Sequence, residues 1–219
     1  MQLVLPFEHM AKAAQYMEPS VFEYVREGEI ESFESFEKFE FLAFDWYDVH
    51  SKRTEDYKML AYVSRENLII FTEGAAGDTA KKIMDGLAAE NPELRSEQLL
   101  YRFFVRLLNG DMDCLSRLEN EIDEYENVYL FKSESGKDVF EKLSAWRREL
   151  LRIKRYYEQL TLIFDEASAN DNSVFSNSAA KRFAILAPTA SSRRCGTCAI
   201  ISSIFRRSIR RSCLSSRTI

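Results

Sequence analysis

A heptad pattern between residues 139 and 164 is the feature that most constrains how this chain can fold. Its apolar residues follow one another at alternating steps of four and three: Val139, Leu143, Trp146, Leu150, Ile153, Tyr157, Leu160 and Phe164. This spacing keeps an apolar seam along one side of a helix. The pattern therefore predicts a long helix over residues 137–167, ~45 Å long at 1.5 Å per residue, whose seam packs against other helices.

Two kinds of partner could cover this seam, and the sequence leaves both open. One is the preceding helix, expected to begin at Asp111 and to carry a stripe of apolar residues at steps of three and four: Leu115, Leu118, Ile122, Tyr125 and Tyr129. That helix is acidic, and basic residues flank the seam: Arg147, Arg148, Arg152, Lys154 and Arg155. An antiparallel hairpin within one chain is thus favoured by charge, whereas self-association through helix 137–167 is the other arrangement.

The first half of the chain contains both strand and helix patterns. Residues 39–47 are rich in aromatics, which favour strands, and residues 57–63 and 68–72 read as a hairpin joined by the polar connector 64–67. Helices are predicted at 79–89, with Asp78 as N-cap and Asn91-Pro92 as the stop, and at 96–109, ended by Asn109-Gly110. Asp111 is expected to cap the next helix. Residues 1–38 give a mixed pattern.

These elements predict an α+β or α/β/α fold: a short mixed or antiparallel sheet, then an acidic helical hairpin, then a long stalk helix with the heptad seam. We divide the 219 residues into an α/β subdomain at 1–93, a helical region at 94–186 and a tail at 187–219. The tail is rich in Ser, Arg and Cys and has no apolar periodicity. It is expected to be disordered.

The tail has a second interpretation, a shifted reading frame. One base of shift converts Ser codons into Leu, Val, Ile or Phe codons and AGR arginine codons into Gln, Glu or Lys codons. A Leu-, Val- and Glu-rich helix would therefore become a Ser-, Arg- and Cys-rich sequence out of frame. A genuine basic tail is the alternative. The pair Cys195 and Cys198 has the spacing of a zinc or redox half-site, but no second pair completes it.

Charge is divided unevenly along the chain. Residues 187–219 hold seven Arg and no acidic residue, so the 23 basic and 35 acidic residues of 1–186 give that part a net charge of −12. Nucleic-acid binding needs Lys and Arg patches, so an acidic body argues against a nucleic-acid partner. Cations or basic partners suit it better.

The sequence contains no apolar stretch near the ~20 residues that a membrane helix needs. Pro6, Glu8 and His9 interrupt the only candidate for the apolar core of a secretory signal. We therefore expect no membrane span in this chain and a cytoplasmic location.

Candidate sites are few. A group of carboxylates lies near the middle of the chain: Asp111, Asp113, Glu119, Glu121, Asp123, Glu124 and Glu126. The group could hold hydrated magnesium, which keeps its waters and needs only one or two carboxylates. A solvated acidic helix face explains these residues equally well. The only histidines, His9 and His50, have no Cys or Ser in a nucleophile context, and Gly74–Gly77 lacks the Lys of a phosphate loop. We therefore expect no enzyme and assign no catalytic, cofactor or metal residue, with magnesium as the one cofactor to consider.

Three segments resemble the cytoplasmic part of CorA-like magnesium transporters, over residues 40–186: Leu99-Leu100-Tyr101-Arg102-Phe103-Phe104, the stretch from Cys114-Leu115 to Glu126, and Arg147-Arg148-Glu149-Leu150-Leu151-Arg152-Ile153-Lys154-Arg155-Tyr156-Tyr157-Glu158-Gln159-Leu160. The resemblance implies an α/β/α cytoplasmic domain, a stalk helix beside acidic helices, a homopentamer and a parent protein in the cell membrane. It also implies a regulatory ion between protomers, for which no residue can be assigned in this chain.

The chain departs from the family pattern in lacking the Gly-Met-Asn signature and the membrane helices. The resemblance therefore implies the cytoplasmic domain of a magnesium or other divalent-cation transporter, truncated before the membrane helices and not itself conducting. The alternative is a soluble coiled-coil scaffold or interaction protein that uses the seam at 139–164. The sequence does not distinguish magnesium from other divalent cations.

Overall fold

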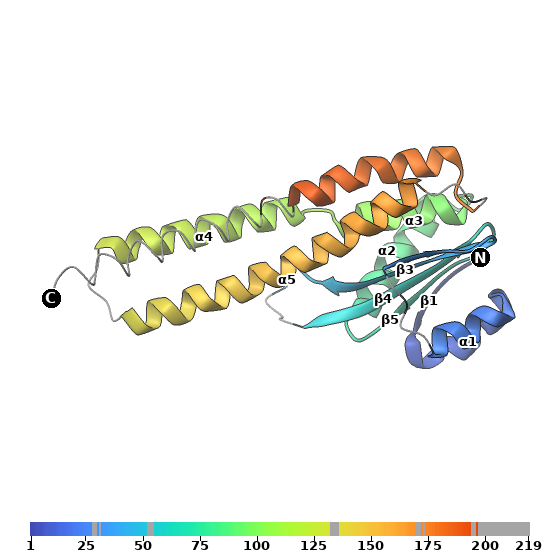
Figure 1. Cartoon of the computed structure of the whole chain (residues 1–219), viewed down its shortest axis with the longest axis horizontal. Helices are drawn as coiled ribbons and strands as arrows, with labels where there is room; N and C mark the ends of the chain where they lie inside the picture. The colour runs from blue at the N-terminus through green and yellow to red at the C-terminus, as the bar shows by residue number, and fades with distance from the viewer. Residues whose placement is uncertain are drawn as a thin grey trace.

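The structure, a computed structural model, describes residues 1–27, 30, 32–51, 55–131, 136–169, 172, 174–193 and 196, with side chains except for those of 20, 26, 27, 126–131 and 136–140. A layered α/β part lies at one end of the elongated molecule, and a long helical hairpin extends away from it (Figure 1). This arrangement confirms the predicted fold class.

The centre of the α/β part is one mixed sheet with the strand order β1-β5-β4-β3-β2. Its strands are β1 (Gln2–Pro6), β2 (Phe33–Ser35), β3 (Phe39–Tyr47), β4 (Asp56–Ser64) and β5 (Leu68–Thr72). β1 pairs with β5 in parallel, and every other pair is antiparallel. The predicted hairpin is confirmed as β4 and β5, with Val63 opposite Leu68.

Both faces of the sheet are buried, which explains why β3 carries large apolar side chains on both of its faces. Side chains of successive strand residues point to opposite faces. Leu42, Phe44 and Trp46 of β3 accordingly belong to one apolar core, and Phe39 and Phe41 belong to another. A sheet covered on both faces does not need the alternation of apolar and polar residues that marks a half-exposed strand.

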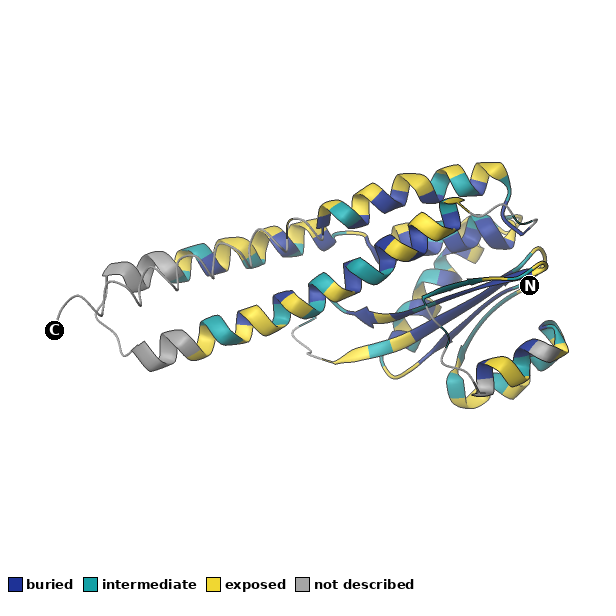
Figure 2. Ribbon diagram, in the orientation of Figure 1, coloured by how far each residue is buried: buried dark blue, intermediate teal, exposed yellow. Residues whose placement is uncertain are grey.

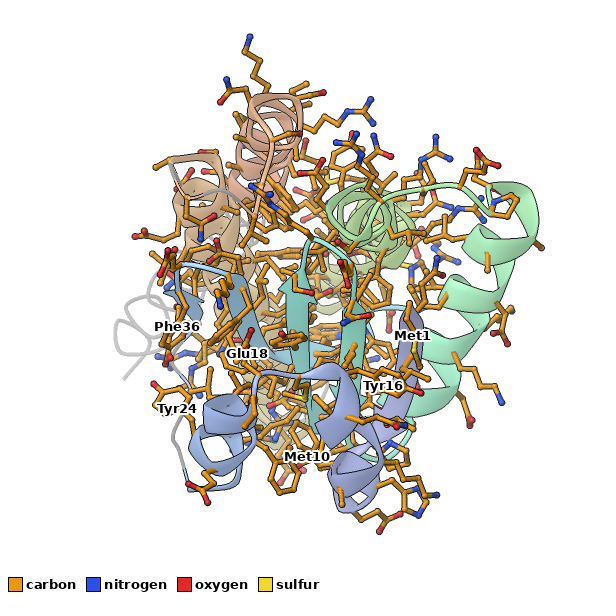
Figure 3. The ribbon with its side chains drawn as sticks, turned by 90° about the vertical axis from the view of Figure 1, so that its right-hand side faces the viewer. Met1, Met10, Tyr16, Glu18, Tyr24 and Phe36 are labelled. Atoms are coloured by element: carbon orange, nitrogen blue, oxygen red, sulfur yellow. The ribbon has the colours of Figure 1, made fainter. Side chains whose placement is uncertain are left out.

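The N-terminal segment, which the sequence pattern left as mixed, forms the layer on one face of the sheet. It contains the 3-10 helix η1 (Phe7–Tyr16) and α1 (Pro19–Glu27). Ala13, Val21 and Val25 are buried against the sheet core that includes Phe41. Tyr24 of α1 lies close to Phe36, with ring centroids 5.9 Å apart (Figure 3).

The helices α2 (Ala76–Glu90) and α3 (Ser96–Leu107), with part of α5 (Gly136–Ala169), cover the other face. Two predicted helix ends need correction. The helix α2 begins at Ala76, so Asp78 lies in its first turn and is not its N-cap. The helix α3 ends at Leu107, two residues before the predicted end, because Gly110 adopts a left-handed backbone conformation just beyond it, with φ +82°.

The acidic helix α4 (Asp111–Phe131) and α5 run antiparallel, side by side (Figure 1). Their side chains meet in a small core in which Ile122 of α4 packs with Trp146 and Leu150 of α5. The rings of Tyr125 and Trp146 contact edge to face, with centroids 5.0 Å apart. The intramolecular hairpin is therefore present, and α5 confirms the predicted helix 137–167.

The seam on α5 is covered by the chain itself over most of its length. Six of its residues are buried: Trp146, Leu150, Ile153, Tyr157, Leu160 and Phe164. Figure 2 shows this buried side of α5 facing the sheet and the neighbouring helices. Leu143 is half-buried, and the side chains of Val139 and Tyr129 lie outside the described residues. Of the two arrangements that the sequence left open, the one within a single chain covers these six residues. Self-association through other residues of the helix stays a prediction.

Residues 177–193 form a further helix that lies beside α5 (Figure 1). Phe183 stacks on Phe164 of α5 at a centroid distance of 6.2 Å. Glu97 of α3 holds the start of this helix, since its carboxylate accepts hydrogen bonds from the Ser176 backbone N at 2.6 Å and from Ser176 Oγ at 2.9 Å.

This helix passes through the predicted start of the tail. Ala187 and Ala190 are buried, and Arg193 is only 8% exposed. The division at 187 therefore falls inside a packed helix, and small Ala side chains carry the contact where the sequence shows no large apolar stripe. Residues 197–219 and the cysteines at 195, 198 and 213 lie outside the described residues, so disorder and the frame shift remain predictions. Within the described part of the chain, no helix is long and apolar enough to cross a membrane.

Candidate functional site

Four segments that are distant in sequence meet around the carboxylate of Asp111. His50 comes from the loop after β3, Asp111 begins α4, Tyr157 lies in the middle of α5, and Arg193 is the last residue of the helical stretch described over 177–193. We call this group the Asp111 junction. It joins the sheet to the three helices that form the elongated part of the molecule.

Asp111 is 2% exposed and bonded on both carboxylate oxygens. Tyr157 Oη donates to Oδ2 at 2.9 Å, and His50 Nε2 lies 3.1 Å from Oδ1. Burial raises the pKa of Asp111, although the hydrogen bond from Tyr157, the positive charge of Arg193 and the neighbouring His50 oppose this rise. The prediction that Asp111 caps α4 is wrong, because Asp111 is the first residue of the helix and the carbonyl oxygen of Gly110 accepts the first helical hydrogen bond, from Cys114 N. Its side chain instead holds α4 to α5 and to the loop after β3.

The hydroxyl of Tyr157 serves as a permanent donor at this junction. Burial raises its pKa well above the ordinary tyrosine value, and the negative charge of Asp111 raises it further. Tyr157 therefore stays protonated and donates to the carboxylate. Burial likewise raises the pKa of the neighbouring Tyr156.

Arg193 brings a buried positive charge to the junction. Its guanidinium lies 5.9 Å from the ring centroid of Tyr157, and Nη2 donates to the carbonyl oxygen of Leu108 at 3.0 Å. A buried carboxylate needs such compensation, since an unpaired buried charge is costly. A residue from the predicted tail is thus part of the interior.

Gly110 allows His50 to reach Asp111. Its φ of +82° is a conformation that residues with a side chain rarely adopt, and a Cβ there would lie 3.1 Å from His50 Cε1. Because Gly110 has no side chain, the imidazole of His50 can pack closely against the backbone just beyond the end of α3.

The outer side of His50 faces a thiol. Nδ1 of His50 lies 3.1 Å from Sγ of Cys114, and Arg117 Nη2 donates to the same sulfur at 2.9 Å. His50 has no nucleophile near it in the sequence, but the fold brings Cys114 beside it from 64 positions away. No local pattern signals this contact, because His50 lies in a loop and Cys114 lies on α4.

Most of the predicted carboxylate group lies on the outside of α4 and is separate from Asp111. Asp113, Glu119, Glu121 and Glu124 are exposed, Asp123 is half-buried, and the side chain of Glu126 lies outside the described residues. Among the described residues, no three or more His, Cys, Asp or Glu side chains are grouped so as to hold a metal ion. The carboxylates thus form a solvated face.

One residue of this face influences α5. Glu149 of α5 has a raised pKa, first because it is partly buried and second because the negative charge of Glu121 lies near it. The two carboxylates repel each other across the α4–α5 hairpin.

A pocket of about 890 Å³ lies at the opposite end of the α/β part, near the labelled Tyr16 and Glu18 in Figure 3. Its polar groups stabilise the fold: Asn67 Nδ2 donates to the Tyr16 carbonyl oxygen at 2.9 Å, and Lys38 Nζ lies 3.8 Å from Glu18 Oε1. His9, which lies in η1, is exposed. This end offers less chemistry than the Asp111 junction and the α4–α5 hairpin.

Comparison with protein families matches residues 12–194 to the family model described as CorA-like Mg2+ transporter protein. Comparison with curated protein sequences gave no match. The matched residues include strands β2 to β5, both long helices and the helical stretch described over 177–193.

Solved structures share the fold. The soluble domain of CorA from Methanocaldococcus jannaschii aligns with a TM-score of 0.71 at 15% identity, covering 91% of this chain and 82% of that one. The complete CorA magnesium transporter of the same organism aligns with a TM-score of 0.74 at 14% identity, covering 96% and 68%. The ZntB cytoplasmic domain from Vibrio parahaemolyticus aligns with a TM-score of 0.58 at 11% identity, covering 92% and 84%.

Proposed function

Because this chain belongs to the family of CorA-like Mg2+ transporter proteins, we propose that it is the cytoplasmic part of a divalent-cation transporter and that magnesium is the cation to which it responds. The solved relatives share its fold over more than nine-tenths of its length. In this proposal the chain binds and responds to the ion, and conduction belongs to membrane helices of the transporter.

The observation that carries the magnesium assignment is the pair of carboxylates across the α4–α5 hairpin. Burial raises the pKa of Glu149, and repulsion from the negative charge of Glu121 raises it further. A divalent cation between them would offset this repulsion. Magnesium suits such a place because it keeps most of its waters and needs only one or two carboxylates. The exposed Glu119 and Glu124 of α4 add negative charge nearby.

Binding at this pair would tie α4 to α5 more firmly. Beyond Trp146 toward the far end of the hairpin, the described contact between the helices rests on few apolar residues, among them Tyr125 and Leu143. A cation that joins Glu121 to Glu149 would add a link beside Ile122 and Leu150, at the base of this weakly packed part. Loss of the cation would leave two repelling charges, and the hairpin would open more readily.

Self-association is the second part of the proposal, with a homopentamer expected from the family. The seam is buried within one chain, so copies would meet through the outward side of α5. Leu151 and Leu162 are exposed there, at 37% and 47%, and their spacing of eleven residues places them on one side of the helix. The coiled-coil scaffold is less well supported, because it requires the seam itself to be free.

Magnesium-dependent unfolding of the full chain tests the assignment. A ligand at 100 times its Kd stabilises the folded state by about 2.7 kcal/mol. We expect magnesium to raise the melting temperature above that in sodium chloride of equal ionic strength, with calcium and cobalt as further arms. Glu121→Gln should abolish the increase, and Glu124→Gln, which removes the same charge from the same helix, should retain it.

Two results would count against the proposal. Equal melting temperatures in magnesium and in matched sodium chloride would exclude a specific cation effect. Equal losses in the Glu121 and Glu124 variants would reduce the effect to general screening of α4. Light scattering of the same samples measures the number of copies, and a Leu162→Glu variant should lower that number without changing the magnesium response.

A further inference from the structure

We propose that Cys114 is a reactive thiol that hydrogen peroxide oxidises to a sulfenic acid, with His50, Asp111 and Arg117 setting its reactivity. This inference rests on the geometry around the sulfur and is independent of cation binding at the α4–α5 hairpin.

The first observation is a chain of three groups in the order used by cysteine nucleophiles. Cys114 Sγ lies 3.1 Å from Nδ1 of His50, and Nε2 of the same ring lies 3.1 Å from Oδ1 of Asp111. Such a sequence of thiol, imidazole and carboxylate activates the sulfur, because the base removes its proton and the acid orients the base. The ionised form of Asp111 favours a hydrogen on Nε2, which leaves Nδ1 as the acceptor that faces Cys114.

The imidazole is held firmly in this position. The backbone N of His50 donates to Asp48 Oδ1 at 3.0 Å, and Gly110 lies against the ring. On the other side, Tyr157 fixes the carboxylate of Asp111 through the second oxygen. A group placed by contacts on several sides does not need to reorganise before it accepts a proton.

The second observation is the guanidinium of Arg117, which donates to Cys114 Sγ at 2.9 Å. Arg117 follows one turn later on α4, and its Nε also donates to the Asp113 carbonyl oxygen at 3.3 Å. Cationic neighbours and partial exposure are the surroundings in which protein thiols react as thiolates. Cys114 is partly exposed and is not in a disulfide, and the side chain of His50 is 46% exposed, so a small reagent can reach the sulfur.

The charge of the surface selects the oxidant. Asp113 is exposed beside Cys114, and residues 1–186 carry a net charge of −12. An anionic disulfide such as oxidised glutathione is repelled by this surface. Hydrogen peroxide is neutral and small, so it can reach a half-exposed sulfur between two helices and a loop.

The reaction balances without a further reagent. His50 Nδ1 accepts the thiol proton, and the thiolate attacks one oxygen of hydrogen peroxide. The S–O bond forms as the O–O bond breaks, so the sulfur loses two electrons and the peroxide gains them. The departing hydroxide takes the proton from His50, which gives one sulfenic acid and one water.

Oxidation changes the contact between Cys114 and His50. An oxygen added to Sγ on the side of the imidazole would not fit within the 3.1 Å to Nδ1 and would displace the ring. Asp111 would then lose one of its two polar partners, and a buried carboxylate that loses a partner is destabilised. Oxidation of Cys114 would thereby weaken the attachment of α4 to the α/β part.

Peptide mapping of the full chain tests this reaction. The chain is treated with hydrogen peroxide in the presence of dimedone, which forms an adduct with sulfenic acid, and is then digested with trypsin. Cys114 falls in the tryptic peptide 107–117. Met112 lies in the same peptide and also takes up oxygen, so the dimedone adduct, and not the gain of one oxygen, is the measure.

The expected result is a peroxide-dependent adduct at Cys114 that forms at least about tenfold faster in the folded chain than in the chain unfolded in urea. His50→Gln should lower the rate in the folded chain at least about tenfold. The chain's other histidine gives the control, since His9→Gln should leave the rate unchanged. Arg117→Met should lower it by a smaller factor.

Absence of the adduct at Cys114 in the folded wild-type chain would overturn the proposal. So would equal adduct rates in the folded and the unfolded wild-type chain, and this outcome does not depend on any variant folding. A His50→Gln variant that keeps its circular dichroism spectrum and reacts as fast as the wild type would also overturn it.

Discussion

Tyr156 and Tyr157 are neighbours on α5, and both are buried. The hydroxyl of Tyr157 donates to the carboxylate of Asp111 at 2.9 Å, whereas the hydroxyl of Tyr156 has no hydrogen-bond partner among the described residues. Two adjacent side chains of the same type thus differ in one interaction. The difference separates the contribution of the hydrogen bond to Asp111 from that of burying an aromatic ring.

Tyr157→Phe should destabilise the fold by about 1.5–3 kcal/mol, the usual range for losing a hydrogen bond to a charged group. Tyr156→Phe removes a buried hydroxyl that has no partner among the described residues, so it should be neutral or stabilise the fold by up to about 1 kcal/mol. Urea unfolding of both variants measures the difference. Equal losses would show that the bond at Asp111 contributes little.

The stability of the Asp111 junction should depend on pH in one direction. The pKa of Asp111 is raised in the folded chain from its ordinary 3.8, so folding favours its protonated form. This favourable contribution is complete below about pH 3.8 and is lost as the pH rises through the folded-state pKa. The free energy of unfolding of the wild type minus that of Asp111→Asn should therefore decrease between about pH 4 and about pH 7.

Asp113→Asn is the control for this pH series. Asp113 begins the same helix but is exposed, so its difference from the wild type should change little over the same range. A difference for Asp111→Asn that stays flat, or that increases with pH, would contradict the assigned direction.

Local sequence patterns predicted the parts of the fold that depend on neighbours along the chain. The helix α5 followed from its heptads, and the β4–β5 hairpin followed from apolar runs around a polar connector. The same patterns could not place His50 beside Asp111, since 61 positions separate them and neither residue belongs to a repeating motif. Contacts of this kind are created by the packing of whole elements.

The helix over 177–193 was only partly predicted, for a different reason. Its contact with the core uses Phe183, Ala187 and Ala190, which follow at steps of four and three. Alanine contributes little apolar area, so a search for large apolar residues ended the pattern at Leu186. The 3-10 helix η1 had no periodic signal of this kind, and residues 1–38 stayed mixed for that reason.

The seam gives a third prediction, because Leu150 and Leu151 are adjacent on α5 but differ in burial. Leu150 is fully buried and Leu151 is 37% exposed. Leu150→Ala should cost about 2–5 kcal/mol, the range for truncating a buried leucine. Leu151→Ala should cost less than about 1 kcal/mol in the monomer.

Chemical denaturation at low protein concentration measures both variants without a contribution from self-association. Concentration dependence then becomes informative. A cost at Leu151 that appears only at high concentration would support the outward side of α5 as the contact between copies. Equal costs at both positions at low concentration would contradict the packing of the seam.

The last prediction separates the helical part of the predicted tail at 187–219 from the rest of that tail. Deleting 197–219 removes five of the seven arginines and a segment without acidic residues or apolar periodicity. We expect the free energy of unfolding to stay within about 0.5 kcal/mol, the scale of surface changes that have no packing role. Deleting 187–219 instead removes the buried Ala190 and Arg193 and should destabilise the Asp111 junction by several times that amount.

If 197–219 is a functional basic segment, the full chain should bind anionic vesicles or RNA with a steep dependence on salt. Loss of such binding in the shorter deletion, at unchanged stability, would overturn the interpretation of this segment as a shifted reading frame.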